Sequence, residues 1–468
     1  MAEKKENKTE SLKSKLFMSN KNGYFAAKKK DLEQIDGFAD GYTDFINKSK
    51  TERLFAKNMA DIARDKGFTE FDPDKKYKSG DKVYYLHRNK ALILCVIGEK
   101  PVKEGVRIAA AHIDSPRIDL KPNPLYEADE LALFKTHYYG GIKKYQWTTI
   151  PLAMYGVIVK SDGEKIDVAL GDKPGEPKFV ITDLLPHLAA QQSKRTLSDG
   201  VRGEELNILV GSRPFNDDKE SQAVKLNIMQ LLNDKYGIVE GDFESAELEF
   251  VPAFDACDIG FDRSLIGGYG HDDRVCAYPA AMAALGCKKP QYTAITVLTD
   301  KEEIGSEGNT GLQSAYMVNF INDLARMQKC EGYDVLRHSK CLSADVTAAY
   351  DPTFADVNEK QNAAYCNHGV CIMKYTGSRG KSGTSDANAE YMGEIRKMLN
   401  DNKIVWQTGE LGKVDAGGGG TVAMYIANLD VDTVDLGVPV LSMHSPYEVI
   451  SKLDLYMAYR AFSVFFEN

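Results

Sequence analysis

The chain has 468 residues, of which 43% are hydrophobic and 27% are charged, and its net charge is -9 at pH 7. These values are ordinary for a soluble globular protein, and the length favours two domains with a sizeable core. The negative charge argues against a nucleic-acid partner, because proteins that bind nucleic acids normally carry a basic surface. The longest apolar stretches fall short of the roughly 18 residues of a membrane-spanning helix, so no membrane partner is expected.

The N-terminus and the cysteines indicate a cytoplasmic protein. Residues 1–17, MAEKKENKTESLKSKLF, contain glutamates and no apolar segment, so we expect a solvated arm and not a secretory signal. The eight cysteines include no CxxC pair, and several lie in apolar runs. Reduced cysteines are therefore expected, and their spacing gives no support to a zinc site with cysteine ligands.

Residues 1–124 are interpreted as the first part of an α/β domain. Apolar residues recur with helical spacing over Asp31–Lys66. Val83–Leu86 and Ala91–Ile97 are predicted to form a pair of strands, and Arg107–Ala111 reads as a short buried strand.

Residues 125–246 have a different pattern. They contain short alternating strands such as Ala153–Lys160 and Ile166–Leu170, a polar, turn-rich stretch at Ser193–Glu205, and a helical segment at Lys219–Lys235. No cluster of metal-ligand residues occurs there. We interpret this segment as a β-rich domain inserted into a discontinuous α/β domain.

The α/β pattern resumes over residues 247–468. Tyr292–Thr299, Cys341–Ala344 and Val434–Leu441 are predicted strands, and a helical pattern runs from Asp272 to about Leu285. These segments predict a mixed, doubly wound α/β sheet, in which ligands bind beyond the carboxyl ends of the strands.

Six acidic and histidine side chains stand where these strands end or where the next helix begins. They are His112, Asp272, Glu302, Glu303, Asp345 and His444. One sheet would bring them to a single crevice. A pair of metal ions about 3.5–4 Å apart needs such a set of carboxylates and imidazoles. Zinc suits these ligands, and manganese or cobalt also fits.

Each of these motifs is a weak signal by itself. Asp114 is placed to fix the tautomer of His112, but a His-x-Asp sequence also fits a capped strand end. The adjacent Glu302 and Glu303 must point apart, so one can ligate while the other acts as a base, although a solvated acidic turn fits the dipeptide too. His444 alone is equally well explained as a core histidine. The combination is what favours a metal site.

The motifs together resemble one known family. His112 begins the segment HIDSPRIDLKPNPLYE, and the later segments are DDR at 272, DKEEIGSE at 300, SAD at 343 and SMHS at 442. In this order they are similar to the aspartyl-aminopeptidase family, the eighteenth family of metallopeptidases, in its bacterial form. The resemblance spans nearly the whole chain.

The resemblance implies a zinc-exopeptidase fold and a di-zinc metalloaminopeptidase that releases single N-terminal residues, with acidic residues as one candidate. The implied ligands of one metal are His112, Asp272 and Asp345, and those of the other are Asp272 as the bridge, Glu303 and His444. Glu302 is the implied general base, and Asp114 supports His112. The implied cofactors are two Zn²⁺ ions per subunit, with Co²⁺ or Mn²⁺ as alternatives.

The family also implies self-association. Its β-rich insert mediates dimers that build a tetrahedral homododecamer, and within it a histidine reaches the active site of a neighbouring subunit. The matching residue here is His187, in the sequence Leu-Pro-His-Leu. A helix-capping or surface histidine is the alternative interpretation of His187.

Substrate recognition is the least defined part of the resemblance. Eukaryotic members have Asp-Asn where this chain has Asp272-Asp273, and the segment around Arg379 does not match their pattern well, which puts acidic specificity in doubt. Lys374, Arg379 and Lys381 are candidates to bind a substrate carboxylate, or they are solvated surface charges. Gly418 and Gly419 lie in a glycine run that lacks the lysine and Ser/Thr of a phosphate-binding loop. Their amides are candidates to bind peptide substrate or the tetrahedral intermediate.

Two other functions compete with the aminopeptidase. A related di-metal hydrolase would act on a different substrate, such as an N-acyl amino acid, and would not need a free α-amine. A catalytically silent scaffold is the third hypothesis, and the intact ligand set with Glu302 speaks against it.

Overall fold

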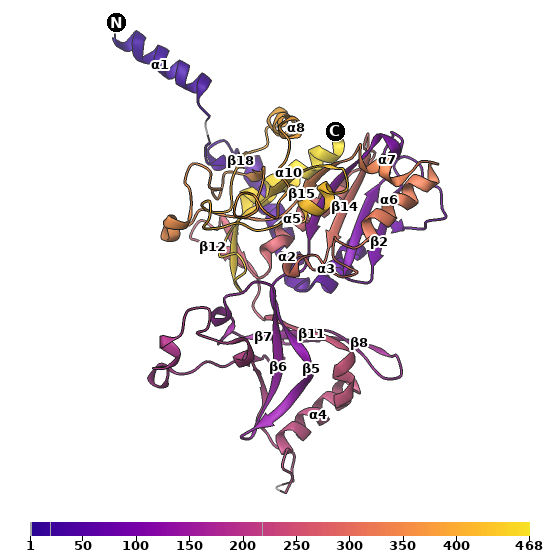
Figure 1. The fold of residues 1–468 in the computed structure, drawn as a ribbon, viewed down its shortest axis with the longest axis vertical. Coiled ribbons are helices and arrows are strands. Elements are labelled where there is room, and N and C mark those ends of the chain that lie inside the picture. The colour runs from indigo at the N-terminus through magenta and orange to yellow at the C-terminus, as the bar shows by residue number, and fades with distance from the viewer. Residues whose placement is uncertain (1, 19, 218) are drawn as a thin grey trace.

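The computed structural model describes residues 2–18, 20–217 and 219–468. The chain forms a larger α/β domain and a second domain inserted into it, drawn below the larger one in Figure 1. The N-terminal helix α1 (Ala2–Leu16) projects away from the larger domain. None of the helices described has the length and apolar character needed to cross a membrane.

The larger domain is built on a nine-stranded sheet in the order β1-β2-β3-β14-β4-β15-β19-β17-β18. The strands are β1 (Thr69–Glu70), β2 (Lys82–His87), β3 (Ala91–Val96), β4 (Val106–His112), β14 (Thr293–Thr299), β15 (Lys340–Ser343), β17 (Val370–Met373), β18 (Trp406–Thr408) and β19 (Asp432–Gly437). The central strands β14, β4, β15 and β19 are parallel, and β3 and β17 flank them antiparallel. The predicted mixed α/β sheet is confirmed.

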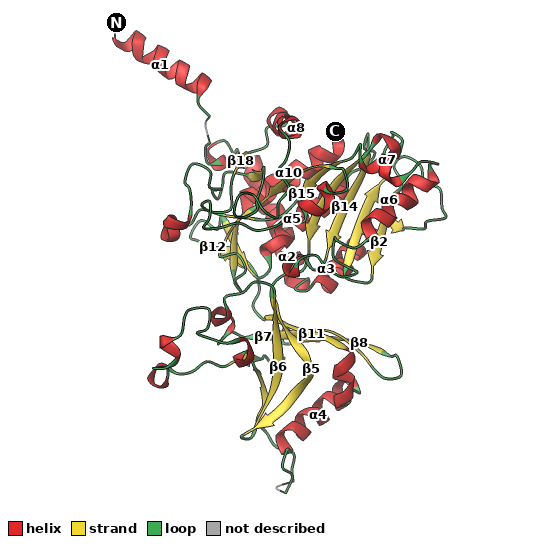
Figure 2. Cartoon of the chain, viewed as in Figure 1, coloured by secondary structure: helices red, strands yellow, loops and turns green. Residues whose placement is uncertain are grey.

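Helices cover both faces of this sheet (Figure 2). One face packs against α2 (Lys29–Lys48), α3 (Glu52–Asp65), α5 (His271–Gly286), α8 (Ala389–Asp401) and α10 (Lys452–Glu467). The other packs against α6 (Tyr316–Met327), α7 (Gly332–Leu336) and α9 (Ala423–Ala427). The helical pattern predicted over residues 31–66 is in fact two helices. Thr51 caps the second of them by accepting a hydrogen bond from the Leu54 amide, which separates α2 from α3.

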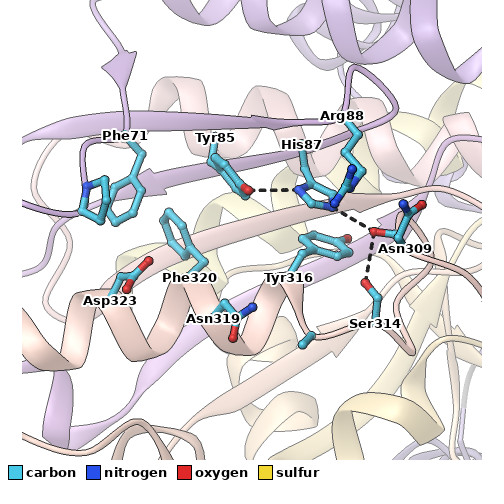
Figure 3. Close-up of a pocket in the computed structure, with 12 residues that line it drawn as sticks. Phe71, Tyr85, His87, Arg88, Asn309, Ser314, Tyr316, Asn319, Phe320 and Asp323 are labelled. Atoms are coloured by element: carbon cyan, nitrogen blue, oxygen red, sulfur yellow. Dashed lines mark hydrogen bonds between the residues drawn. The ribbon is translucent and has the colours of Figure 1, made fainter.

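On the face of the sheet that packs against α6, a hollow of about 350 Å³ lies between β2 and α6 (Figure 3). Aromatic side chains form much of its lining. His87 lies within it, with one ring nitrogen 3.0 Å from the Tyr85 hydroxyl and the other 2.8 Å from the Asn309 carbonyl oxygen. Its ring stacks on Tyr316. Both nitrogens are engaged, so His87 is a satisfied structural histidine.

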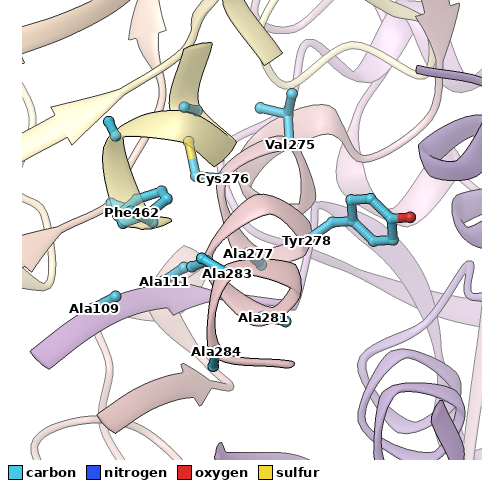
Figure 4. Packing of buried hydrophobic residues seen from close by; sticks show 14 of the residues in the cluster. Ala109, Ala111, Val275, Cys276, Ala277, Tyr278, Ala281, Ala283, Ala284 and Phe462 are labelled. Atoms are coloured by element: carbon cyan, nitrogen blue, oxygen red, sulfur yellow. The ribbon is translucent and has the colours of Figure 1, made fainter. Parts of the chain in front are cut away.

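Helix α5 packs closely on the sheet because its buried face is rich in alanine. Ala277, Ala281 and Ala284 are fully buried near the equally small Ala109 and Ala111 of β4 (Figure 4). Small side chains let the helix backbone approach the strand, and the large aromatic residues of α10 fill the remaining space. This contact fixes the start of α5 beside the end of β4.

The inserted domain contains a seven-stranded sheet in the order β8-β7-β11-β5-β6-β10-β9, with its own apolar core. Its strands are β5 (Arg117–Ala128), β6 (Leu131–Tyr139), β7 (Leu152–Val159), β8 (Lys165–Leu170), β9 (Val180–Ile181), β10 (Ile208–Gly211) and β11 (Ala246–Pro252). Helix α4 (Ala223–Tyr236) packs against the sheet.

The second sheet extends beyond the boundaries predicted at residues 124 and 246. Strand β5 starts at Arg117 and β11 ends at Pro252, so both strands run into segments that were assigned to the larger domain. The Pro-Asn-Pro sequence at residues 122–124 lies just before the predicted boundary. In the structure it causes only a register shift between Leu120 and Leu125, because proline removes hydrogen-bond donors without ending the strand.

A third, five-stranded sheet completes the larger domain, in the order β12-β13-β21-β20-β16. Its strands are β12 (Cys257–Ile259), β13 (Leu265–Gly268), β16 (Thr347–Ala348), β20 (Pro439–Leu441) and β21 (Glu448–Ser451). The single strand predicted over residues 434–441 is therefore wrong. It divides at Val438, where the chain passes from β19 in the main sheet to β20 in this one.

Candidate metal centre

Three neighbouring parallel strands supply the first part of the site. Strand β4 lies between β14 and β15, and the three run in the same direction. His112 is the last residue of β4, Glu302 and Glu303 follow β14, and Asp345 follows β15. Parallel strands bring their carboxyl ends to one edge, which is where the structure places these four side chains.

Asp272 and His444 reach the same point from the third sheet. Asp272 is in the first turn of α5, just after β13, and His444 follows β20. The sequence analysis expected one sheet to gather all six side chains. It is wrong on this point, because the chain changes sheets before each of these two residues.

Each of the six side chains lies within 4.0 Å of at least one of the others. The two carboxylate oxygens of Asp272 point to different histidines, Oδ1 at 3.1 Å from His112 Nε2 and Oδ2 at 3.2 Å from His444 Nε2. Glu303 Oε2 is 3.5 Å from His444 Nε2. On the other side, Glu302 Oε2 and Asp345 Oδ1 are 3.9 and 4.0 Å from His112 Nε2. Asp272 therefore lies between two groups of ligand-type atoms.

Asp114 organises the turn that carries the two glutamates. Its Oδ1 accepts a hydrogen bond from the Glu302 amide at 3.1 Å, and its Oδ2 accepts one from the Glu303 amide at 3.2 Å. His112 Nδ1 donates to the Asp114 carbonyl oxygen at 3.0 Å, since a carbonyl can only accept. The Nε2 atom of His112 is thereby left facing the carboxylates.

Glu448 contacts the candidate site, and the sequence analysis missed it. It is buried, and its two oxygens accept hydrogen bonds from the His444 amide at 2.7 Å and the Asp272 amide at 3.0 Å. Its position four residues after His444 was the one sequence feature that could have indicated a contact with that residue. Nothing in the sequence indicated that it would also hold Asp272.

Burial and mutual repulsion disturb the carboxyl groups. Burial raises the pKa of Glu302 to about 7, opposed by His112 and reinforced by Asp114. Burial also raises the pKa values of Glu303, with help from Asp272, and of Asp345, with help from Glu302. Burial would raise the pKa of Asp272 as well, but hydrogen bonds from His112 and His444 hold it below its usual range. Crowded buried carboxylates of this kind are relieved by cations.

The donor set fits metal ions in its chemistry and its geometry. His112, Glu302 and Asp345 have ligand atoms within 4.8 Å of one another, as do His112, Asp272 and Glu303. Within the part of the chain that the structure describes, Glu303 Oε1 is buried without a hydrogen-bond partner. Carboxylate and imidazole ligands suit zinc.

His271, next to Asp272, is not part of this set. It is fully buried, and its Nδ1 lies 2.7 Å from the Tyr42 hydroxyl. Burial lowers its pKa to about 3, so the ring is neutral. It contributes to the packing behind the site.

The predicted substrate-binding residues lie on two loops that contact each other. Lys374 and Lys381 have their nitrogens 3.8 and 2.8 Å from Asp386, and Arg379 lies between them on the same loop. Gly418 has a positive φ and packs against the backbone at Gly377, and Gly419 lies near Leu411. After the glycine run, the Tyr425 hydroxyl of α9 donates to the Gly305 carbonyl at 3.3 Å, which links this loop to the glutamate turn.

His187 lies on the inserted domain, in a 3₁₀ turn at Pro186–Leu188. The turn is exposed, and so are the large apolar side chains of Leu184, Leu185 and Leu188. The structure therefore leaves His187 accessible at the surface of its own subunit.

Comparison with known proteins shows the family of the chain. The model of the M18 family of aminopeptidase I zinc metalloproteases matches residues 45–466. The chain belongs to the M18 family. Members of this family are peptidase hydrolases, so the predicted enzyme class is confirmed.

Individual M18 relatives cover nearly the whole chain. A probable M18 family aminopeptidase 1 of Clostridium acetobutylicum is 47% identical over 463 residues, covering 97% of this chain and 99% of the relative. The crystal structure of an M18 aminopeptidase from Thermotoga maritima has a TM-score of 0.91 at 43% identity, covering 96% and 99%. The S. cerevisiae mApe1 dodecamer has a TM-score of 0.76 at 19% identity, covering 93% and 97%, which supports the shared fold.

Proposed function

We propose that this M18 member is a di-zinc aminopeptidase that removes single residues from peptide N-termini. The observation that carries the proposal is the position of Asp272, with one oxygen toward His112 and the other toward His444. A carboxylate in that position is suited to bridge two ions. His112 and Asp345 would complete one site, and Glu303 and His444 the other.

Glu302 is then left free to act as the base. The ligands above give each ion three protein groups, which is the usual number at a catalytic zinc with an open position. The Glu302 side chain is 19% exposed, against 3% for Glu303, so Glu302 faces the side from which substrate would enter. Zinc ions held there would lower the pKa of a water molecule. Glu302 would accept its proton and deliver it to the leaving amine.

Metal binding is the first property to test. Protein stripped of metal and titrated with Zn²⁺ should saturate near two ions per subunit, and its melting temperature should rise because ions that bind only the folded state stabilise it. Co²⁺ and Mn²⁺ are the alternative ions to titrate. Saturation at one ion, or no binding, contradicts the dinuclear site.

The need for a free α-amine is the second property to test. A peptide with a free N-terminus should be cleaved, and the same peptide with an acetylated N-terminus should not. Liquid chromatography of the products would identify the released residue. Equal rates on both peptides would instead support a related di-metal hydrolase of N-acyl substrates.

In this proposal, the loop at residues 374–386 binds the side chain of the substrate's N-terminal residue and so determines which residue is preferred. Lys374, Arg379 and Lys381 offer positive charge, and an acidic substrate side chain would compete with Asp386 for the two lysines. A panel of amino-acid anilides, assayed at known zinc content, would determine whether Asp and Glu are preferred.

We further propose that the enzyme works as a tetrahedral homododecamer built from dimers. The described dodecamer of S. cerevisiae mApe1 shares the fold, and the exposed leucines around His187 provide an apolar surface of the kind found at protein interfaces. His187 would then act in a neighbouring subunit's site.

The eight cysteines are all unpaired, which suits the cytoplasmic location proposed for the protein.

A further inference from the structure

The inserted domain sends one segment back into the metal centre of its own subunit. Strand β6 ends at Tyr139, and Gly140 and Gly141 follow it. Tyr139 and Gly141 form hydrogen bonds with Asp114 and His444, and Gly140 between them lies beside Glu303. No motif in the sequence pointed to them.

Tyr139 completes the hydrogen bonding of Asp114. Its buried hydroxyl donates to Asp114 Oδ2 at 2.8 Å. The same carboxylate accepts the amides of Glu302 and Glu303, so its orientation determines where the glutamate turn lies. Tyr139 therefore adds a third hydrogen bond to the two amides that hold the Asp114 carboxylate.

The ring of Tyr139 is itself held in place by Arg117. The guanidinium carbon of Arg117 lies 3.8 Å from the ring centroid. Arg117 is buried, and it pairs with Glu249 at 2.7 Å and with Asp119 at 2.8 Å within the second sheet. It also reaches Glu52 of α3 at 3.5 Å. The ring thus lies against an ion-pair group that joins the two domains.

The two glycines position the ligands more directly. Gly141 accepts a hydrogen bond from His444 Nδ1 at 2.7 Å, and because a carbonyl only accepts, this leaves His444 Nε2 free to ligate. Gly140 has φ of 77°, and a Cβ atom there would lie 3.2 Å from Glu303 Oε2. A side chain at this position would press on the carboxylate.

We infer that Tyr139–Gly141 is a positioning element of the metal centre, through which the inserted domain orients Asp114, Glu303 and His444 of the same subunit. Tyr139 acts through Asp114, and Gly141 acts through His444. The inference rests on the proposed di-metal function. It is separate from the role proposed for His187, which concerns a neighbouring subunit.

The test compares Tyr139→Phe with Tyr391→Phe. Both changes remove one buried hydroxyl that donates one hydrogen bond, since the Tyr391 hydroxyl donates to the Cys341 carbonyl at 3.0 Å, away from Asp114. Both variants should therefore lose a similar amount of thermal stability. Groups that support metal ligands typically change metal affinity or activity about 10–100-fold when they are removed.

Tyr139→Phe should accordingly bind Zn²⁺ about 10–100-fold more weakly in competition with a chelator, or lower kcat by that factor with little change in KM. The visible absorption spectrum of the Co²⁺-substituted protein should also change. Tyr391→Phe should retain wild-type zinc affinity, spectrum and kcat. Gly140→Ala provides a second variant, and it should weaken zinc binding because its Cβ displaces Glu303.

Wild-type zinc affinity, spectrum and turnover in folded Tyr139→Phe or in folded Gly140→Ala would overturn the inference. Equal losses in Tyr139→Phe and Tyr391→Phe would overturn it too, because they would reflect stability alone. If the unaltered protein binds no zinc, the proposed function fails and this inference fails with it. If the unaltered protein binds two ions and Tyr139→Phe matches it, only the inference fails.

Discussion

Glu302→Gln is expected to lower kcat by about 10²–10⁴-fold while the protein still binds two zinc ions, since loss of a general base has that effect. The amide is nearly the same size as the carboxylate, and the Glu302 backbone remains held by Asp114 at 3.1 Å. Turnover of a free peptide measured beside zinc content would separate the two effects. Wild-type and variant should show the same zinc stoichiometry.

Glu303→Gln is the matched control, because it makes the same chemical change at the adjacent residue. Glu303 lies 3.5 Å from His444 Nε2 in the more buried position, so this variant should lose affinity for one ion. If Glu302→Gln lost metal and Glu303→Gln kept it, Glu302 would be the ligand and Glu303 the base, which contradicts the proposed assignment.

His187→Ala is expected to keep both metals and assemble normally, yet lose turnover by about 10²–10³-fold. A histidine supplied by a neighbouring subunit can donate a hydrogen bond to the oxyanion, and removal of one such donor has an effect of this size. The residue is exposed in its own subunit, so the substitution should barely change the free energy of unfolding. Light scattering and zinc analysis would confirm the intact assembly.

Mixing two inactive variants distinguishes a trans role from a local one. Subunits with His187→Ala retain Glu302, and subunits with Glu302→Gln retain His187. After subunit exchange, some mixed assemblies should regain activity, because an intact Glu302 site then receives His187 from its neighbour. No recovery despite proven exchange, or a fully active His187→Ala, would remove the trans role.

Much of this molecule could be predicted from local sequence patterns. The strands that end at His112, before Glu302 and before Asp345 were recognisable because short buried strands are continuous apolar runs followed by polar residues. The parallel order of β14, β4 and β15 then follows the general behaviour of α/β sheets. The division at Ser49–Thr51 between α2 and α3 was missed, because the helical periodicity continues across a cap that only the backbone reveals.

The domain boundaries illustrate a second limit. The sequence analysis placed a boundary just before Leu125, where the pattern of the sequence changes after two prolines. Strand β5 nevertheless continues with a shifted register, because its pairing with β6 on either side outweighs the lost donors. The resemblance in the motifs identified the chemistry, but it did not locate the edge of the second sheet.

What the sequence alone determined is the set of ligand-type side chains and the strands that carry most of them, since both depend on residues close together in the chain. Only the tertiary structure decided how they meet. Asp272 and His444 arrive from the third sheet, Glu448 holds the backbone of both, and Tyr139 reaches Asp114 from the inserted domain. Glu448 is only four residues from His444, but the contacts of Glu448 with Asp272 and of Tyr139 with Asp114 join residues 176 and 25 positions apart. No local pattern encodes them, because they depend on how three sheets pack around one point.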